Sequence, residues 1–536
     1  MSDMPRRIAI YDTTLRDGAQ AGGVTFSLVD KLAIAHRLDE FGVDYIEGGY
    51  PLSNPKDAAF FVEMGKRPLR RARMVAFGNT RRAKTSADRD QGIRTLLEAA
   101  TDSVAIVGKS WDFHVAEVLR VPLDENLAMI GDSVACLKGR GRRVFFDAEH
   151  FFDGFRHNPD YALACLRAAD EAGADAIVLC DTNGGTLTDK VREAVRAARS
   201  AVKAELAIHV HDDAGLAVAN TLAAVEEGAT QVQGTINGIG ERCGNVDLCV
   251  VIPDLALKMG YDLLVPGAIQ QLTHMSRYVY QVANLNPPLR QPYVAANAFA
   301  HKGGLHVDGV QKNVRTYEHV DPAQVGNERR ILISELSGTA AIMTKARKLD
   351  ERIDRATSRR ILDAVQEMEN QGYEFEAAEA SFQLLVRKLL GTHRTFFDLQ
   401  GFRVIVERRG GDKAPISEAT VKLKVRGESR LTVGEGDGPV HALDVALRAA
   451  LEDFYPGLQQ IRLVDYKVRI VNPKAATAAR ICVVIESTDG EDVWGTVGVS
   501  DNIIEASWQA LVDSIEYALL RGEAGAAGGQ GEAQAP

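Results

Sequence analysis

The sequence is poor in cysteine, and its cysteines are not paired in any C-x-x-C motif. Only six occur among the 536 residues, and they are scattered along the chain. A disulfide framework, a thiolate zinc site and a thioredoxin-type motif all require closely spaced cysteines, so the sequence argues against each of them. Unpaired cysteines are typical of a reducing compartment, and we therefore expect a cytoplasmic protein.

Long apolar runs and clustered positive charge are also lacking. No apolar run approaches the length of a membrane span, and residues 1–7 lead directly into a strand without the apolar region of a secretory signal. Lys and Arg number 63 against 73 Asp and Glu, which gives a formal net charge of −10, whereas nucleic-acid binding requires a clustered basic excess. We therefore expect no membrane partner and no nucleic-acid partner.

The first half of the chain alternates short β-type apolar runs with longer stretches of helical period. This alternation predicts a parallel sheet. Eight strand-helix units in roughly 260 residues match the typical size of a (β/α)₈ TIM barrel, which we place at residues 1–275. Active sites in such barrels lie at the C-terminal ends of the strands. The predicted strands are residues 8–11, 44–47, 74–77, 103–107, 143–146, 176–179, 207–210 and 231–235.

Three further regions follow the predicted barrel. Residues 276–395 mix helix and loop and include a charged helical run at 344–371, which indicates a helical connector. Residues 396–522 twice repeat the order of three strands and a helix, which predicts an α+β domain of duplicated βββα units. Residues 523–536 are mostly Gly, Ala, Glu and Gln, and we expect a disordered tail.

Polar residues gather where the predicted strands end. His209 and His211 end the seventh strand, and a spacing of two places both imidazoles on one face, where they can reach one metal ion. Arg16 and Asp17 follow the first strand and would add a guanidinium and a carboxylate to the same rim. One carboxylate with two imidazoles suits Mg²⁺, Mn²⁺, Co²⁺ or Zn²⁺. Taken alone, an H-x-H pair is more often incidental, and an Arg-Asp dipeptide is usually a surface ion pair.

Other polar residues are less specific. Asn245 lies in a glycine-rich segment after the eighth strand, where it is either a further metal ligand or an ordinary helix cap. The spacing of those glycines does not match a dinucleotide-binding motif. Glu47, Glu149 and Thr182 follow three other strands. Residues 297–310, together with Tyr317, lie outside the barrel and indicate either a loop that completes a site or a surface loop without a role.

Taken together, these residues resemble a superfamily of metal-dependent (β/α)₈ acyltransferases and lyases that includes 2-isopropylmalate synthase, homocitrate synthase and citramalate synthase. Four motifs occur in the family's order, and within the family residues 19–23 and 47–51 look most like the citramalate synthase branch. The C-terminal module is similar to the family's regulatory domain. The four motifs are Asp-Thr-Thr-Leu-Arg-Asp-Gly at 12–18, His-Val-His-Asp at 209–212, Asn-Gly-Ile-Gly-Glu-Arg-Cys-Gly-Asn at 237–245 and Gly-Leu-His-Val-Asp-Gly at 304–309.

The resemblance implies a role for each motif residue. It makes Asp17, His209 and His211 the metal ligands, with Asn245 as a possible fourth.

On the substrate side, it implies that Arg16 steadies the keto acid and the developing alkoxide and that Glu47 holds this arginine. Glu149 and Thr182 would lie near the keto-acid carboxylate or the CoA side of the pocket.

The fourth motif, at 304–309, lies in the connector, as does Tyr317. The resemblance implies that His306 and Tyr317 assist removal of a proton from the acetyl group, reaching in from a partner subunit. Asp308, in the same motif as His306, is expected to contact substrate.

The implied reaction is a Claisen-type condensation of acetyl-CoA with a 2-keto acid. For the citramalate synthase branch the keto acid is pyruvate, and the reaction begins a threonine-independent route to isoleucine. The resemblance also implies a homodimer with feedback inhibition by isoleucine or leucine. Three alternatives remain: a 2-isopropylmalate synthase that takes 2-oxoisovalerate, a lyase of the same superfamily, and a non-catalytic amino-acid sensor built on the C-terminal module.

Overall fold

The computed structural model describes residues 6–334, 339–347, 349–408, 415–471, 479–490 and 492–528. The chain folds into two compact units, which are described separately. The first comprises Met1–Phe299 and His319–Arg329, and the second comprises Ala300–Glu318 and Arg330–Pro536. The region expected to be a connector therefore contributes to both units.

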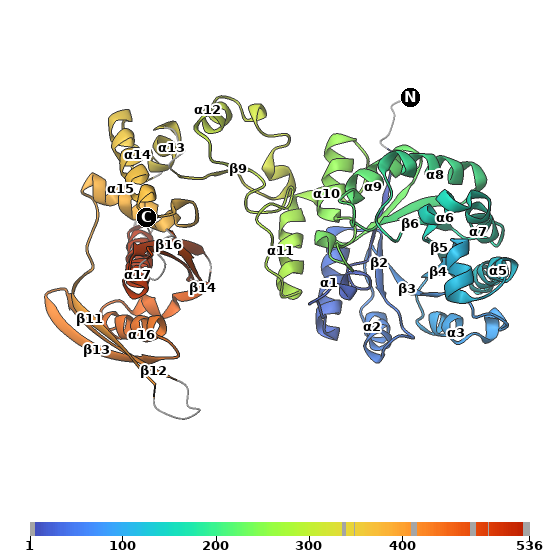
Figure 1. Ribbon diagram of the computed structural model, residues 1–536, viewed down its shortest axis with the longest axis horizontal. Coiled ribbons are helices and arrows are strands. Elements are labelled where there is room, and N and C mark those ends of the chain that lie inside the picture. Colours follow the sequence, from blue (N-terminus) through green and yellow to red (C-terminus); the bar gives the residue numbers. More distant parts are fainter. Residues whose placement is uncertain are drawn as a thin grey trace, which may run out of the picture. The chain divides into compact units, whose positions relative to one another are not determined.

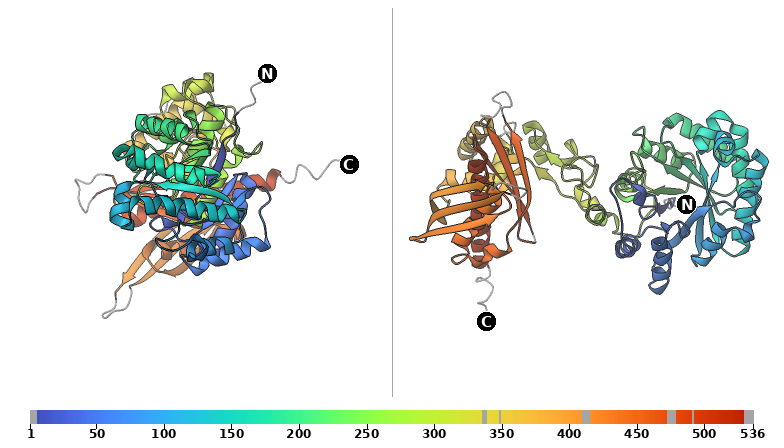
Figure 2. Two further views of the ribbon diagram at one scale, coloured as in Figure 1. Left: turned by 90° about the vertical axis from the view of Figure 1, so that its right-hand side faces the viewer. Right: turned by 60° about the horizontal axis from the view of Figure 1, so that its bottom comes forward.

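The first unit is a closed barrel of eight parallel strands in the order β1 to β8, which confirms the predicted barrel (Figure 1). Figure 2 shows the ring of strands with helices around it. The strands are β1 Ala9–Asp12, β2 Tyr45–Gly49, β3 Arg73–Asn79, β4 Ser103–Lys109, β5 Arg143–Glu149, β6 Ala176–Asp181, β7 Glu205–Val210 and β8 Gln231–Gly234. The helices are α1 Leu28–Phe41, α2 Pro55–Lys66, α3 Gln91–Glu98, α4 Asp112–His114, α5 Leu123–Gly139, α6 Phe151–His157, α7 Pro159–Glu171, α8 Thr188–Ala201, α9 Ala217–Glu226, α10 Leu248–Pro253 and α11 Leu272–Val282.

Local sequence signals explain the limits of these elements, as helix α1 illustrates. The Ser27 side chain accepts a hydrogen bond from the backbone of Asp30, and the Asp30 side chain accepts one from the backbone of Ser27, which together form a capping box. The helix ends at Gly42, whose φ of 92° is readily adopted only by glycine.

Aromatic side chains fill part of the barrel interior. The rings of Tyr11, Tyr45 and Phe145 lie 5.0–5.8 Å apart, centroid to centroid. Inward-pointing side chains from different strands thus close the barrel as a packed core rather than a channel, which is usual for this fold. A larger apolar core lies between the strands and the surrounding helices.

The second unit contains the duplicated module. Two three-stranded antiparallel sheets, each followed by a helix, confirm the predicted βββα repeat. The first repeat consists of β11 Phe397–Glu407, β12 Ile416–Val425, β13 Glu428–Gly436 and α16 Pro439–Leu451. The second consists of β14 Arg462–Ile470, β15 Ile481–Thr488, β16 Val493–Ser500 and α17 Ile503–Gly528. One apolar core joins both repeats, with the Phe402 ring stacked on Trp508 at 5.2 Å.

The remaining elements precede the module. They are the short strands β9 Ala300–His301 and β10 Arg330–Ile331, with the helices α12 Gly304–Lys312, α13 Thr339–Arg347, α14 Arg355–Asn370 and α15 Glu379–Leu390. The helical run expected at 344–371 is two helices rather than one, because the Asp354 side chain accepts a hydrogen bond from the Thr357 backbone and starts α14.

The C-terminal end differs from the expectation in one respect. Helix α17 continues to Gly528, whereas we expected a disordered tail from residue 523. The rest of that expected tail, residues 529–536, lies outside the described residues. None of the helices among the described residues combines the length and the apolar character needed to span a bilayer.

Candidate metal centre

The loop after β1 presents Arg16 and Asp17 to the barrel mouth and is held by buried hydrogen bonds. The Asp12 carboxylate accepts hydrogen bonds from both the backbone N–H and the hydroxyl of Thr14, each at 2.9 Å. The Thr14 hydroxyl in turn accepts one from the Ile236 backbone at 2.9 Å, which ties this loop to the segment after β8. These hydrogen bonds therefore fix the backbone of the loop that carries Arg16 and Asp17.

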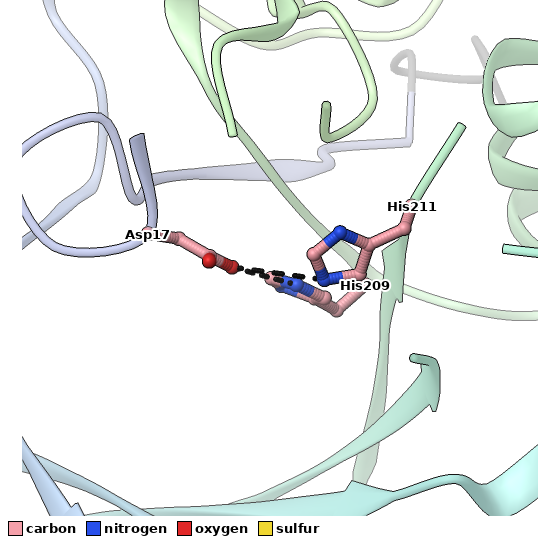
Figure 3. Close-up of side chains that lie close together, drawn as sticks. All are labelled: Asp17, His209 and His211. Carbon is pink, nitrogen blue, oxygen red and sulfur yellow. Dashed lines mark ion pairs between the residues drawn. The ribbon is translucent and has the colours of Figure 1, made fainter. Parts of the chain in front are cut away.

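Asp17, His209 and His211 converge at the mouth of the barrel (Figure 3). The Asp17 Oδ2 atom lies 3.1 Å from Nε2 of His209 and 3.9 Å from Nε2 of His211. One ligand atom from each residue lies within 4.8 Å of the other two, and all three side chains are buried. Among the residues that the structure describes, no other group of three or more His, Cys, Asp and Glu has this geometry.

Burial and neighbouring charges shift the pKa values of all three cluster residues. Burial alone would raise the pKa of Asp17, but the Arg16 guanidinium and the His209 ring hold it well below its usual range. Burial opposes the positive charge of His209, yet the hydrogen bond to Asp17 raises the pKa of that ring. Burial, followed by the charge of His209, lowers the pKa of His211 to about 4, so its imidazole is neutral near pH 7. A cation there would meet a carboxylate and a neutral imidazole.

Gln233 on β8 orients one of the two imidazoles. Its Oε1 lies 3.2 Å from Nδ1 of His209, which leaves Nε2 directed at Asp17. Metal-binding histidines commonly have their second ring nitrogen held in this way, because the bond fixes the ring orientation and the tautomer.

Asn245 completes the buried cluster. Its Nδ2 lies 3.0 Å from Oδ2 of Asp17 and 3.2 Å from Nε2 of His209, while its Oδ1 has no hydrogen-bond partner within the described part of the chain. A half-turn about the Cβ–Cγ bond would present this oxygen to a cation. A Cβ atom at Gly240 would meet Oδ1 at 1.9 Å, so a larger residue there would displace the Asn245 side chain. An oxygen without a partner beside a carboxylate and two imidazoles fits a divalent cation such as Mg²⁺, Mn²⁺, Co²⁺ or Zn²⁺.

Arg16 is held in place on two sides. Its Nε donates to Oε2 of Glu47 at 2.5 Å, and its guanidinium lies over the Phe77 ring at 4.1 Å and 3.4 Å from Asp17. Glu47 is fully buried and also accepts a hydrogen bond from the Tyr11 hydroxyl at 2.7 Å. Glu47 therefore positions the arginine; it is not among the residues that line the cavity in front of Asp17, His209 and His211.

That cavity has a volume of about 290 Å³ and is open to solvent on one side. Arg16 and the three cluster residues line it together with Glu149 and Thr182, which the sequence predicted for the same rim. Glu149 forms an ion pair with Lys109, and the Thr182 hydroxyl accepts a hydrogen bond from the His150 backbone at 2.9 Å. The cavity is large enough for a small keto acid.

Three predicted site residues lie in the second unit. The ring of His306 stacks on that of Tyr317 at 4.1 Å, and both side chains are exposed to solvent. Asp308 forms an ion pair with Lys312 one helical turn away, with 2.6 Å between Oδ2 and Nζ. Within that unit, His306 and Tyr317 are thus preassembled as a pair.

Sequence reasoning did not single out Asp147 or Gln233. Asp147 is buried, lines the cavity and has one carboxylate oxygen without a partner among the described residues. Burial, followed by the nearby Glu47, raises its pKa to about 7. The sequence did contain a signal for Asp147. It lies two residues before Glu149 in β5, so the two side chains point to the same face of the strand.

Comparison with known proteins agrees with this architecture. The HMGL-like family profile matches residues 7–279, the profile described as homocitrate synthase post-HMGL domain-like matches 293–373, and the LeuA allosteric (dimerisation) domain matches 376–519.

Individual proteins extend the similarity to nearly the full chain. The chain is 53% identical to the (R)-citramalate synthase of Geobacter sulfurreducens, over 96% of this chain and 98% of that protein. It is 49% identical to the (R)-citramalate synthase of Aquifex aeolicus, over 97% and 99% of the two chains. A protein of Methanopyrus kandleri named "Probable 2-isopropylmalate synthase" is 32% identical, also over 97% and 99%. A solved structure of HMG-CoA lyase from Bacillus subtilis matches with a TM-score of 0.46 and 18% identity, over 53% of this chain and 97% of that one.

The identity to curated (R)-citramalate synthases extends over almost the whole chain. It agrees with the residues at the rim, where a fixed guanidinium lies beside three residues that could hold a metal ion. The chain belongs to the HMGL-like family and, within it, to the citramalate synthases, and it is an enzyme of the acyltransferase type.

Proposed function

We propose that this enzyme is an (R)-citramalate synthase, which condenses acetyl-CoA with pyruvate to give citramalate and CoA. The observation that carries the proposal is the buried cluster of Asp17, His209 and His211, with Arg16 fixed beside it in one cavity. Relatives that bear this name at 49% and 53% identity support pyruvate over the bulkier 2-oxoisovalerate. We assign the reaction to the cytoplasm, in keeping with the six free cysteines.

Asp17, His209 and His211 would hold a divalent cation, with Asn245 as a fourth ligand once its amide is turned. When bound, the cation would act as a Lewis acid on the ketone of the keto acid. Arg16 adds a fixed positive charge where the alkoxide develops, and Glu47 keeps that charge in place before the substrate arrives, so that little reorganisation is needed during the reaction.

The remaining residues handle the thioester and the proton. His306, supported by Tyr317 and supplied by a partner subunit, takes a proton from the acetyl methyl group. The methyl carbon then forms a bond to C2 of pyruvate as the π bond of the ketone breaks, and the resulting alkoxide takes up the proton that the base removed. Water then cleaves the thioester to give a carboxylate and release CoA. We assign Glu149 and Thr182 to the keto-acid carboxylate or the CoA side of the cavity, and Asp308 to substrate contact.

A panel of keto acids tests the proposal. CoA release from acetyl-CoA is measured with Mn²⁺ and pyruvate, 2-oxobutanoate or 2-oxoisovalerate. We expect kcat/KM for pyruvate to exceed that for 2-oxoisovalerate by at least about tenfold, since two additional methyl groups change binding by a few kcal/mol in a fitted pocket. A preference for 2-oxoisovalerate would identify a 2-isopropylmalate synthase instead, and binding of acetyl-CoA without turnover would favour an amino-acid sensor.

We further propose that the βββα module dimerises and carries feedback inhibition by isoleucine, with leucine as the second candidate. The match to a LeuA allosteric (dimerisation) domain supports this assignment. Full-length enzyme and a chain ending after residue 395 are compared by CoA release and light scattering. We expect isoleucine to inhibit only the full-length dimer, and inhibition of the shortened chain by both amino acids would refute the role.

A further inference from the structure

The loop after β8 has an unusual backbone conformation close to the metal cluster. Arg242 has a φ of 56°, in the left-handed region that arginine rarely adopts. Gly244, with a φ of 101°, allows a close approach, because a Cβ atom there would meet the Gly238 carbonyl oxygen at 2.1 Å. This backbone conformation is unfavourable for arginine and must be offset by other contacts. The hydrogen bonds of the Arg242 side chain provide them.

The Arg242 guanidinium bonds to two other loops of the rim. Its Nε and NH2 donate to the two carboxylate oxygens of Asp213, at 2.8 and 2.9 Å, in a bidentate pair. NH2 also donates to the backbone carbonyl oxygen of Thr182 at 2.7 Å. We call this arrangement of Arg242, Asp213 and the Thr182 carbonyl the rim clasp. It joins the loops that follow β6, β7 and β8.

Each joined loop carries a residue of the proposed site. Thr182 lines the cavity itself, His211 lies two residues before Asp213, and Asn245 lies three residues after Arg242. Backbone hydrogen bonds connect the same loops, from Asp212 N–H to the Gly244 carbonyl at 2.9 Å and from Ala214 N–H to the Gly184 carbonyl at 2.9 Å. The clasp therefore connects the part of the cavity wall that holds His211 with the part that holds Thr182.

We propose that Arg242 is a positioning residue that fixes the spacing between His211 and Thr182, and that this spacing limits the size of the keto acid accepted. The first half concerns metal binding and stands without the proposed function; the second half rests on it. A bidentate guanidinium-carboxylate pair that also binds a backbone carbonyl restricts the distances among all three groups.

An ordinary surface ion pair is the competing explanation. Exposed pairs contribute little to stability or function, and the Arg242 side chain is 42% exposed. Two observations argue for more than this: the left-handed backbone of Arg242, and the position of Arg242 in the wall of the cavity.

The test uses the full-length enzyme with Arg242→Met, Arg242→Lys and Asp213→Asn. Mn²⁺ affinity is measured by EPR titration without substrate, and kcat and KM are measured for pyruvate and 2-oxoisovalerate. We expect Arg242→Met to raise the Mn²⁺ Kd about tenfold, the usual scale for losing a group that orients a metal ligand. We also expect KM for pyruvate to rise about tenfold while kcat changes less than about threefold, and the preference for pyruvate to fall at least about fivefold.

The other variants separate geometry from charge. Arg242→Lys keeps the charge but not the planar fork, so we expect it to recover only part of the Mn²⁺ affinity. The double variant Arg242→Met/Asp213→Asn should be no worse than Arg242→Met by more than about twofold, since both changes break the same contact. Should Arg242→Met fail to fold, Arg242→Lys and Asp213→Asn still carry the test.

Arg156→Met is the matched control. It removes another exposed rim guanidinium, which is paired with Asp153 at 3.3 Å, and should behave as wild type. Unchanged Mn²⁺ affinity and KM in the Arg242 variants would overturn the proposal, as would equal losses in Arg156→Met. If wild-type enzyme turns over no pyruvate, the proposed function fails, while the Mn²⁺ titration still decides whether Arg242 positions the metal side.

Discussion

Replacing Arg16 with methionine is expected to remove most of the condensation activity and to destabilise the barrel at the same time. Arg16 supplies the fixed positive charge in the cavity, and losing one such preorganised group typically lowers kcat by about 10²–10³-fold. Its removal also leaves the fully buried Glu47 carboxylate with the Tyr11 hydroxyl as its remaining hydrogen-bond donor within the described part of the chain. Breaking a buried ion pair from one side costs about 3–5 kcal/mol. CoA release and urea unfolding measure the two effects separately.

A second substitution separates stability from catalysis. Changing Glu47 to glutamine in the Arg16→Met background removes the unpaired charge, so most of the lost stability should return. Activity should not return, because the guanidinium is still missing. If the double variant recovered activity, Arg16 would be a structural residue only, and the proposed stabilisation of the alkoxide would be wrong.

Replacing Asp17 with asparagine is expected to be the most damaging single change to metal binding. Asparagine keeps the shape but removes the only carboxylate among the three cluster residues. We expect the Mn²⁺ Kd to rise at least about 10²-fold and the condensation rate to fall at least about 10³-fold, because the ion then loses its one negatively charged ligand. EPR titration and CoA release with saturating acetyl-CoA measure these effects.

Asp30→Asn is the matched control for that change. Asp30 is the acidic partner of the capping box that starts α1, and it does not belong to the cluster. Its loss should cost about 1 kcal/mol of stability at most and leave Mn²⁺ affinity unchanged. A wild-type Mn²⁺ Kd in Asp17→Asn would remove Asp17 from the ligand set.

The barrel could be predicted from the sequence because each strand must pack apolar side chains into the core and is therefore marked by an apolar run. It placed the strand ends less well, because backbone pairing continues after the apolar run stops. In β5 the predicted strand ended at residue 146, yet the ladder pairs Asp147 with Val107 and Glu149 with Lys109. Asp147 was therefore overlooked, although the alternation of side chains along a strand places it on the same face as Glu149.

That Asp17, His209 and His211 lie together was predictable for a different reason. The H-x-H spacing puts two imidazoles on one face of β7, and the barrel topology brings the loop after β1 to the same rim. Contacts that depend on side-chain packing were not predictable. The hydrogen bond between Gln233 and His209, and the bidentate pair of Arg242 and Asp213, join residues whose proximity no local pattern indicates.

The proposed mechanism depends on Asp17, His209 and His211 sharing one divalent cation at the barrel mouth. Anomalous diffraction from crystals of the full-length enzyme soaked in Zn²⁺ or Mn²⁺ tests it most directly. The account predicts one strong peak about 2.0–2.2 Å from Oδ2 of Asp17 and from Nε2 of both histidines. A peak elsewhere in the protein, with no anomalous density among these three side chains, would contradict it.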